Sequence, residues 1–316
     1  MSVPLLPIAA NTEVGLMSGF QSYTHLATTI ESLDRLQYDS VWVGDHIAYT
    51  TPILDPMLQL AQAAALSDRL KVGTGIYLLP LRSAAIAAKQ ASSLEHLSNG
   101  RFVFGVGVGG EFPNEFDACG VPVGQRGARL SEAIDVMRLL WRGEPCSFAG
   151  EFTSFNDVHM QPATLSVGGP PIWCGGRSKA ALSRIGRIAD GWISYVVTPE
   201  QYRQGLQTII DGARSVGREL QQLGTAHLLF VRMADSRDEA LEQGNAILSK
   251  RYAMDFRRAT ERYCALGPGD AIIETLREFH AAGVRKFILD FLGSPDEQAA
   301  QLERFSAEVL PVLRAL

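Results

Sequence analysis

Several apolar runs of this sequence are followed directly by side chains that can act as acids, bases or hydrogen-bond partners. Asp45-His46 follows one run, and Glu111 follows another after Gly109-Gly110. A histidine titrates near neutrality, so His46 could move the proton that accompanies hydride transfer. Asp45-His46 could equally hydrogen-bond a cofactor ring, or be a structural histidine held by its neighbouring carboxylate.

The segment Gly175-Gly176-Arg177-Ser178 has the residue types of an anion site. The glycines allow the backbone to approach a ligand closely, and Ser178 fits the N-cap of a helix over residues 179–188. Exposed amides, the helix dipole and the Arg177 guanidinium would then favour a phosphate. A plain tight turn with a serine cap explains the same residues about as well.

A second glycine-rich segment, Gly105-Val-Gly-Val-Gly-Gly110, matches the G-x-G-x-x-G pattern. We reject a dinucleotide-binding interpretation because the first glycines lie inside the apolar run and no helix opens directly after the third. The segment instead predicts a flat, side-chain-free floor on which a ring could lie. Glycines required for strand curvature are the alternative.

The other polar residues expected at or just after run ends are Asn11, Arg82, Asn114, Tyr195 and Asp290. Neither a cluster of metal ligands nor a carboxylate pair of the glycosidase type is evident, which disfavours a metal-dependent hydrolase. This pattern favours a bound planar cofactor that carries the chemistry while the protein supplies shape and orientation.

Eight short apolar runs, most of them followed by a helical-period segment, are expected to position these residues. Alternating strands and helices of this kind predict a single (β/α)8 TIM barrel over residues 1–316, with its site at the carboxyl ends of the strands. Insertions are expected after strands 4 and 7 (111–123 and 236–267) and as a hairpin before strand 5 (143–169). The expected strands are residues 5–10, 40–44, 71–79, 102–108, 171–174, 192–197, 226–233 and 286–291.

Composition excludes several classes of protein. The chain has 316 residues, 46% hydrophobic and 20% charged, and a net charge of −5, so we expect neither nucleic-acid nor membrane binding. Four widely spaced cysteines indicate reduced thiols. We therefore expect a cytoplasmic protein.

Several stretches resemble the bacterial luciferase-like superfamily of flavin- and deazaflavin-dependent oxidoreductases. The motifs that carry the resemblance are Ser40-Val-Trp-Val-Gly-Asp-His46, Lys71-Val-Gly-Thr-Gly-Ile76, Phe104-Gly-Val-Gly-Val-Gly109, Pro171-Ile-Trp-Cys-Gly-Gly176 and Ala189-Asp-Gly-Trp192. Together they imply a (β/α)8 barrel with insertions, commonly a homodimer.

The resemblance also implies roles for particular residues. Gly75-Ile76 matches the position of a non-prolyl cis peptide behind the cofactor ring, and Asp45-His46 matches the pair beside the ring. Val108-Gly109 matches a wall of the cofactor site, and residues 175–178 match its phosphate-binding segment. Glu111 stands one residue later than the acidic residue of several deazaflavin reductases.

The stretch 120–129 is most similar to the subgroup that uses the deazaflavin coenzyme F-420 (F420). This implies hydride transfer to or from a small organic substrate. One alternative is an FMN-dependent monooxygenase that takes reduced flavin from a reductase partner. Another is a non-catalytic flavin-binding barrel.

Overall fold

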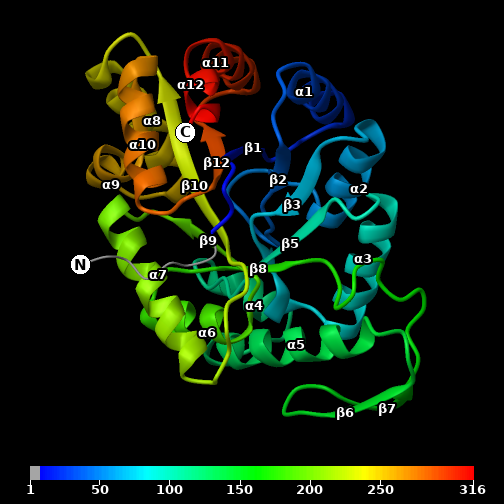
Figure 1. The fold of residues 1–316 in the computed structure, drawn as a ribbon. Helices are drawn as coiled ribbons and strands as arrows, with labels where there is room; N and C mark the ends of the chain where they lie inside the picture. Colours follow the sequence, from blue (N-terminus) through cyan, green and yellow to red (C-terminus); the bar gives the residue numbers. More distant parts are fainter. Residues whose placement is uncertain (1–7) are drawn as a thin grey trace.

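The computed structural model describes residues 8–316 and has the expected (β/α)8 architecture (Figure 1). Within that range, eight parallel strands close a barrel, each hydrogen-bonded to the next. In order around the barrel they are β1 (Glu13–Met17), β2 (Ser40–Val43), β3 (Lys71–Thr74), β5 (Phe102–Gly107), β8 (Ile172–Gly175), β9 (Gly191–Tyr195), β10 (Gly224–Met233) and β12 (Lys286–Phe291).

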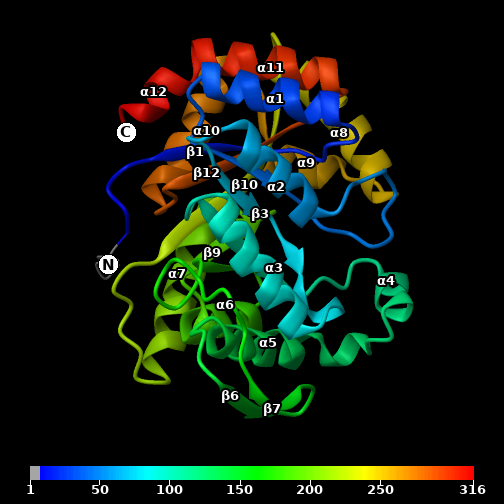
Figure 2. The same ribbon diagram turned by 90° about the vertical axis from the view of Figure 1, so that its right-hand side faces the viewer.

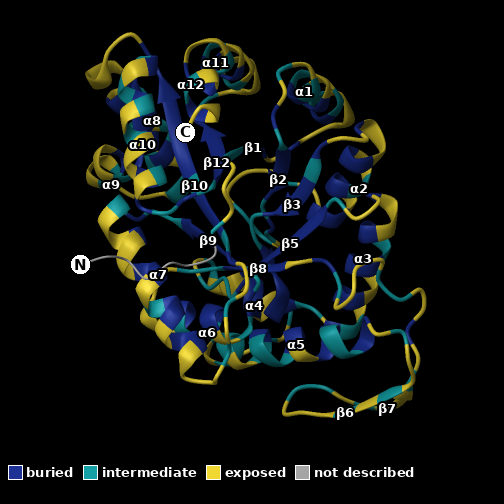
Figure 3. Ribbon diagram, viewed as in Figure 1, coloured by how far each residue is buried: buried dark blue, intermediate teal, exposed yellow. Residues whose placement is uncertain are grey.

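Helices surround the barrel and turn their apolar faces toward the strands (Figure 3). They are α1 (Tyr23–Arg35), α2 (Pro56–Leu66), α3 (Ala84–Leu97), α5 (Arg126–Leu140), α6 (Lys179–Ile188), α7 (Pro199–Arg214), α10 (Gly269–Ala281), α11 (Pro295–Glu308) and α12 (Leu310–Arg314). Across residues 8–316, no helix combines the length and apolar character needed to cross a bilayer.

The three expected insertions are confirmed. The first contains α4 (Pro113–Ala118) and a short 3-10 turn (Val123–Gln125), and the third contains α8 (Arg237–Tyr252), α9 (Arg257–Tyr263) and a strand, β11 (Ala265–Gly267), that we did not expect. The second is an antiparallel hairpin of β6 (Cys146–Ala149) and β7 (Ser154–Val158). Figure 2 shows the hairpin projecting away from the barrel, on the side of the molecule opposite α11.

The expected first strand is wrong. Residues 5–7 lie outside the described part of the chain, residues 8–10 are not in a strand, and β1 is Glu13–Met17. We predicted a strand over residues 5–10 because that run is apolar. The barrel interior instead requires small and charged residues in its first strand. A Cβ on Gly15 would lie 2.3 Å from Ser40 Oγ and 2.9 Å from Trp42 Nε1.

Tryptophan rings and one cluster of charged side chains fill the barrel interior at the amino ends of the strands. Trp42 and Trp173 pack 6.0 Å apart between ring centroids. The Lys286 ammonium lies 5.4 Å and 5.3 Å from these two rings and pairs with Glu13 Oε2 at 2.5 Å. The interior is therefore filled at the amino end, and the carboxyl end is left for the site.

Candidate active site at the carboxyl ends of the strands

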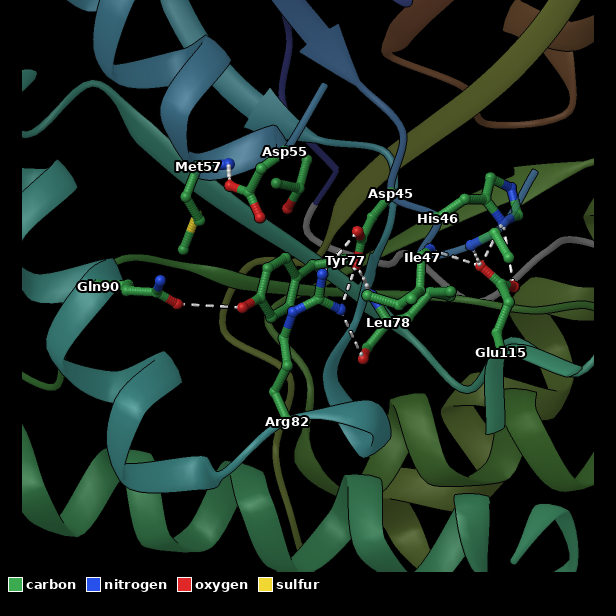
Figure 4. Close-up of polar contacts among 12 residues, drawn as sticks. Asp45, His46, Ile47, Asp55, Met57, Tyr77, Leu78, Arg82, Gln90 and Glu115 are labelled. Carbon is green, nitrogen blue, oxygen red and sulfur yellow. Dashed lines mark hydrogen bonds and ion pairs between the residues drawn. The ribbon is translucent and has the colours of Figure 1, made fainter. Parts of the chain in front are cut away.

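His46 is held by a carboxylate that the first insertion supplies. Its Nδ1 atom lies 3.2 Å from both side-chain oxygens of Glu115 on α4, and the amides of Ile47 and Ala48 donate to Glu115 Oε1 at 2.6 and 3.1 Å (Figure 4). The Glu115 side chain is 1% exposed and that of His46 is 22% exposed. Since Glu115 acts as an acceptor here, Nδ1 carries a proton and Nε2 is left as the free nitrogen.

The His46 ring is also fixed by aromatic neighbours. Tyr49 stacks on it with ring centroids 4.0 Å apart, and Phe112 meets its edge at 5.3 Å. Two loops, one after β2 and one after β5, therefore orient one imidazole. Sequence reasoning selected His46 but missed Glu115, which stands in the unremarkable stretch Phe112-Pro-Asn-Glu115.

Asp45 has a different partner. Both of its oxygens accept from the Arg82 guanidinium, at 2.7 and 2.8 Å, and Oδ2 also accepts from the amide of Leu78 (Figure 4). Burial raises the pKa of the Asp45 carboxyl, and the Arg82 charge opposes that shift. With its oxygens occupied, Asp45 fixes the segment after β3 and is not available to react.

The Gly75–Ile76 peptide bond is cis, as the family resemblance implies, and it divides the expected third strand into β3 and β4 (Tyr77–Leu78). The Ile76 side chain projects over neighbouring strands. A Cβ on Gly107 would lie 1.7 Å from Ile76 Cδ1, and a Cβ on Gly175 would lie 3.0 Å from Ile76 Cγ2.

These contacts correct the role that we expected for the glycines of β5, which is the fourth strand of the barrel. Gly107 is covered by Ile76, and a Cβ on Gly105 would lie 1.8 Å from the Thr74 carbonyl oxygen. Both glycines make room for the adjacent strand, so they are not a bare floor for a ring. The residues that follow, Val108 and Gly109, are partly exposed at the carboxyl end.

Glu111 and Tyr195 meet across the same end of the barrel. The Tyr195 hydroxyl donates to Glu111 Oε1, and the Arg177 guanidinium lies 5.1 Å from the Tyr195 ring. Burial, and then the Glu111 carboxylate, raise the pKa of the Tyr195 hydroxyl, which therefore stays protonated. Because the Tyr195 hydroxyl donates its one proton to Glu111, the pair presents acceptor oxygens at this end of the barrel.

The Gly175–Ser178 segment opens α6 as expected. Ser178 Oγ accepts from the amide of Ala181 at 3.2 Å, and Trp192 Nε1 donates to the Gly176 carbonyl at 2.7 Å. Gly176 has φ +143°, and a Cβ there would lie 2.6 Å from the Ala181 Cβ. Arg177 is exposed beside this helix N-terminus.

The third insertion contributes an ion pair that sequence reasoning did not find. Arg251, at the end of α8, donates to Asp290 Oδ2 on β12 at 2.7 Å, and its carbonyl accepts from Thr50 Oγ1 at 3.0 Å. The Asp290 carboxylate raises the pKa of Arg251, so the guanidinium remains charged. The pair connects this insertion to the barrel and to the loop after β2.

One expected site residue lies elsewhere. Asn11 precedes β1 and is exposed, at the amino end of a strand whose carboxyl end faces the site. The misplaced first strand accounts for this error. In the described part of the chain, no three His, Cys, Asp or Glu side chains come close enough together to hold a metal ion.

Comparison with known proteins identifies the family. The sequence pattern of the luciferase-like monooxygenase family matches residues 5–309. The 4-hydroxyprotoasukamycin monooxygenase of Streptomyces nodosus subsp. asukaensis is 30% identical over 221 residues, which are 67% of this chain and 59% of that protein. The F420-dependent glucose-6-phosphate dehydrogenase of Nakamurella multipartita is 27% identical, with 93% of each chain covered.

Solved structures share the fold. Monooxygenase RslO1 from Streptomyces bottropensis has a TM-score of 0.81 at 22% identity, covering 95% of this chain and 99% of that one. An F420-dependent secondary alcohol dehydrogenase has a TM-score of 0.83 at 19% identity, covering 96% and 99%. The chain belongs to the luciferase-like monooxygenase family.

Proposed function

We propose that this protein is an oxidoreductase that moves a hydride through bound deazaflavin F420 to or from a small organic substrate. The observation that carries the proposal is the His46–Glu115 pair at the carboxyl end of the barrel. The similarity to an F420-dependent dehydrogenase over 93% of both chains supports the same cofactor.

The residues present fit such a cofactor. Gly176 lies so close to α6 that a Cβ there would clash, and this lets backbone amides and Arg177 face a phosphate group at the helix N-terminus. The Ile76 side chain, fixed over Gly107 and Gly175, would contact the ring from the barrel side. When bound, a deazaflavin supplies two-electron hydride transfer and reacts poorly with oxygen.

His46 would handle the proton in this reaction. Oxidation of an alcohol releases one hydride and one proton, and reduction of a ketone takes up both. Glu115 keeps a proton on Nδ1, so Nε2 can accept the substrate proton or, when protonated, return it. The Tyr195 hydroxyl and Glu111 would orient the polar group of the substrate.

A second candidate function is an FMN-dependent monooxygenation with a reductase partner. The 30% identical Streptomyces monooxygenase favours it. The phosphate of FMN would occupy the same helix N-terminus, because that site recognises a phosphate and not a ring. Binding of the two cofactors therefore has to be compared directly.

We further propose that the protein forms a homodimer through α2 and α3. Large apolar side chains are exposed on both neighbouring helices: Leu58 at 73%, Leu66 at 37%, Ile86 at 61% and Leu97 at 66%. Their spacing places Leu58 with Leu66 on one stripe, and Ile86 with Leu97 on another. Exposed apolar side chains on two neighbouring helices are typical of a protein interface.

His46→Ala tests the proposed function. We expect this variant to lose turnover by two orders of magnitude or more, which is about what general acid–base catalysis supplies, while its affinity for F420 changes little. His96→Ala on the exposed face of α3 is the matched control. Unchanged turnover in His46→Ala would remove this residue from the mechanism.

A further inference from the structure

The inward-facing side chains of β12 and β9 end on an aspartate and a tyrosine. Along β12, Lys286 and Ile288 point into the barrel interior, where Ile288 packs in one apolar cluster with Ile193 of β9. Successive side chains of a strand point to opposite faces, so Asp290 and Tyr195, two residues later on these strands, also face inward. Both side chains therefore lie at the opening of the barrel, at the carboxyl ends of the strands, where we place the substrate.

Arg251 binds the Asp290 carboxylate at this opening. Its Nη1 atom donates to Asp290 Oδ2 at 2.7 Å, and the two side chains are 22% and 12% exposed. The guanidinium also lies 5.8 Å from the centre of the Phe230 ring, and Phe230 is the neighbour of Asp290 on β10. An anion that entered the site would therefore find this guanidinium already occupied, with a carboxylate beside it.

The loop after β2 brings the proposed proton carrier near this ion pair. Thr50 Oγ1 donates to the Arg251 carbonyl at 3.0 Å. Burial raises the pKa of the Tyr49 hydroxyl, the Arg251 charge opposes that shift, and the Asp290 carboxylate adds to it. Tyr49 therefore lies within electrostatic reach of the pair while its ring stacks on His46.

Uncharged side chains supply more of the lining. Phe112 meets the Tyr49 ring with centroids 5.3 Å apart, and Tyr252 stacks on Phe256 at 4.8 Å. Burial, and then the neighbouring Tyr49, raise the pKa of the Tyr252 hydroxyl, which therefore stays neutral. Leu228 of β10, partly buried, packs on the apolar cluster of the barrel interior. A substrate that matches these side chains is uncharged and largely apolar.

The carboxylates at the opening oppose an anionic substrate. Glu111, which accepts from the Tyr195 hydroxyl, adds a second carboxylate to that of Asp290. An anion here would lose water and meet both carboxylates, while Arg251 is already bound to one of them. Unfavourable charge of this kind is a common means of rejecting the wrong ligand.

We propose that Asp290 is a specificity-determining residue that, by holding Arg251, restricts the substrate to an uncharged, largely apolar alcohol or ketone. The inference rests on the proposed function and deepens it, because it names the class of substrate for that site. The reaction is unchanged: the alcohol gives up one hydride and one proton, and the ketone takes up both. Removal of the Asp290 charge would free the Arg251 guanidinium to bind a carboxylate of the substrate.

Two ketones of nearly the same shape test this role: 4-acetylbenzamide, which is uncharged, and 4-acetylbenzoate, which is an anion at neutral pH. Ligand-observed NMR titration of the full chain, with and without F420, gives the Kd of each ketone. We expect the unaltered protein to bind the amide at least about tenfold more tightly than the carboxylate.

Asp290→Asn should reverse the discrimination against the anion. We expect this variant to bind 4-acetylbenzoate about tenfold more tightly than the unaltered protein does, and added salt to reduce the gain, while the affinity for the amide changes less than about threefold. Asp290→Asn combined with Arg251→Gln should lose the gain, because the freed guanidinium is then absent. Asp68→Asn, at an exposed position between α2 and β3, is the control and should bind both ketones as the unaltered protein does.

The outcomes separate this inference from the proposed function. Equal or tighter binding of the carboxylate by the unaltered protein overturns the inference, and this comparison needs no variant. Binding of neither ketone, an unchanged affinity of Asp290→Asn for the carboxylate, or a gain that persists without Arg251 also overturns it. In each of these cases, binding of F420 leaves the proposed function standing. Failure of F420 to bind overturns the proposed function, whereas the titrations without cofactor still decide the role of Asp290.

Discussion

The Nδ1 atom of His46 lies 3.2 Å from both carboxylate oxygens of Glu115, although 69 positions separate the two residues in the chain. The fold of the first insertion creates this pair, because α4 turns Glu115 back toward the end of β2. The buried carboxylate also accepts from the amides of Ile47 and Ala48. Glu115 therefore fixes the position and the tautomer of the proposed proton carrier.

Glu115→Gln should lower kcat by roughly tenfold to a hundredfold, which is part of the contribution expected of general acid–base catalysis, with little change in KM. The amide can donate to Nδ1 and so favour the other tautomer. Nitrogen NMR of the His46 ring should show that redistribution, which a loss of packing alone would not cause. Asp117→Asn, on the exposed side of α4, is the control; unaltered kcat and tautomer in Glu115→Gln would contradict this role.

The Asp45–Arg82 pair should contribute to stability. Asp45→Asn leaves the partly buried Arg82 charge without its partner, so we expect the free energy of unfolding to fall by about 3 kcal/mol. Replacing both residues, as in Asp45→Asn with Arg82→Met, should cost less than the sum of the single changes. Urea denaturation measures both; strictly additive effects would show that the pair is not coupled.

Much of the fold could be predicted because apolar runs, helical periodicity and N-cap residues are local signals. Helix 179–188 and the runs that became β2 and β12 were predicted closely. The first strand was not, because its interior positions hold Glu13 and Gly15, and the requirement for them comes from Lys286 and Trp42 on other strands. Local hydrophobicity contains no information about such neighbours.

The site residues also could be predicted only where the local sequence was sufficient. His46 and the Gly175–Ser178 segment could be selected because residue type and strand-end position suffice. Glu115 could not, since it binds a histidine that only the folded barrel brings near. Asp45 precedes His46 in the sequence, yet its partner is Arg82.

His227 should make stability fall as the solution is acidified. Burial lowers the pKa of this side chain from 6.5 to about 3. Between these values the unfolded chain binds a proton that the folded chain does not, so stability is lost as pH falls from 6.5 toward 3, by up to about 1.4 kcal/mol per pH unit.

The comparison of His227→Gln with His96→Gln measures this contribution. His227 stacks on Phe279 with ring centroids 4.1 Å apart, whereas His96 is exposed. The unfolding free energy of His227→Gln should depend less steeply on pH in this window, and that of His96→Gln should follow the unaltered protein. A parallel pH dependence in all three proteins would contradict the assignment to His227.

Introducing charged side chains into the proposed α2–α3 interface tests whether it holds a dimer together. Leu58→Glu combined with Ile86→Glu should convert the dimer to a monomer, because both side chains are more than half exposed on adjacent helices and would be buried between subunits. Val216→Glu, 54% exposed in the unaltered chain and beyond the end of α7, should leave the dimer intact. Sedimentation equilibrium gives the masses; a monomeric unaltered protein would refute the interface.

Equilibrium titration of the unaltered protein with F420 and with FMN tests the central claim most directly. The carboxyl end of the barrel, from Ile76 to Arg177, is expected to bind F420 with a Kd in the micromolar range or below, and more tightly than FMN. Tighter binding of FMN would favour the monooxygenase function. Binding of neither cofactor would contradict the whole account of this site.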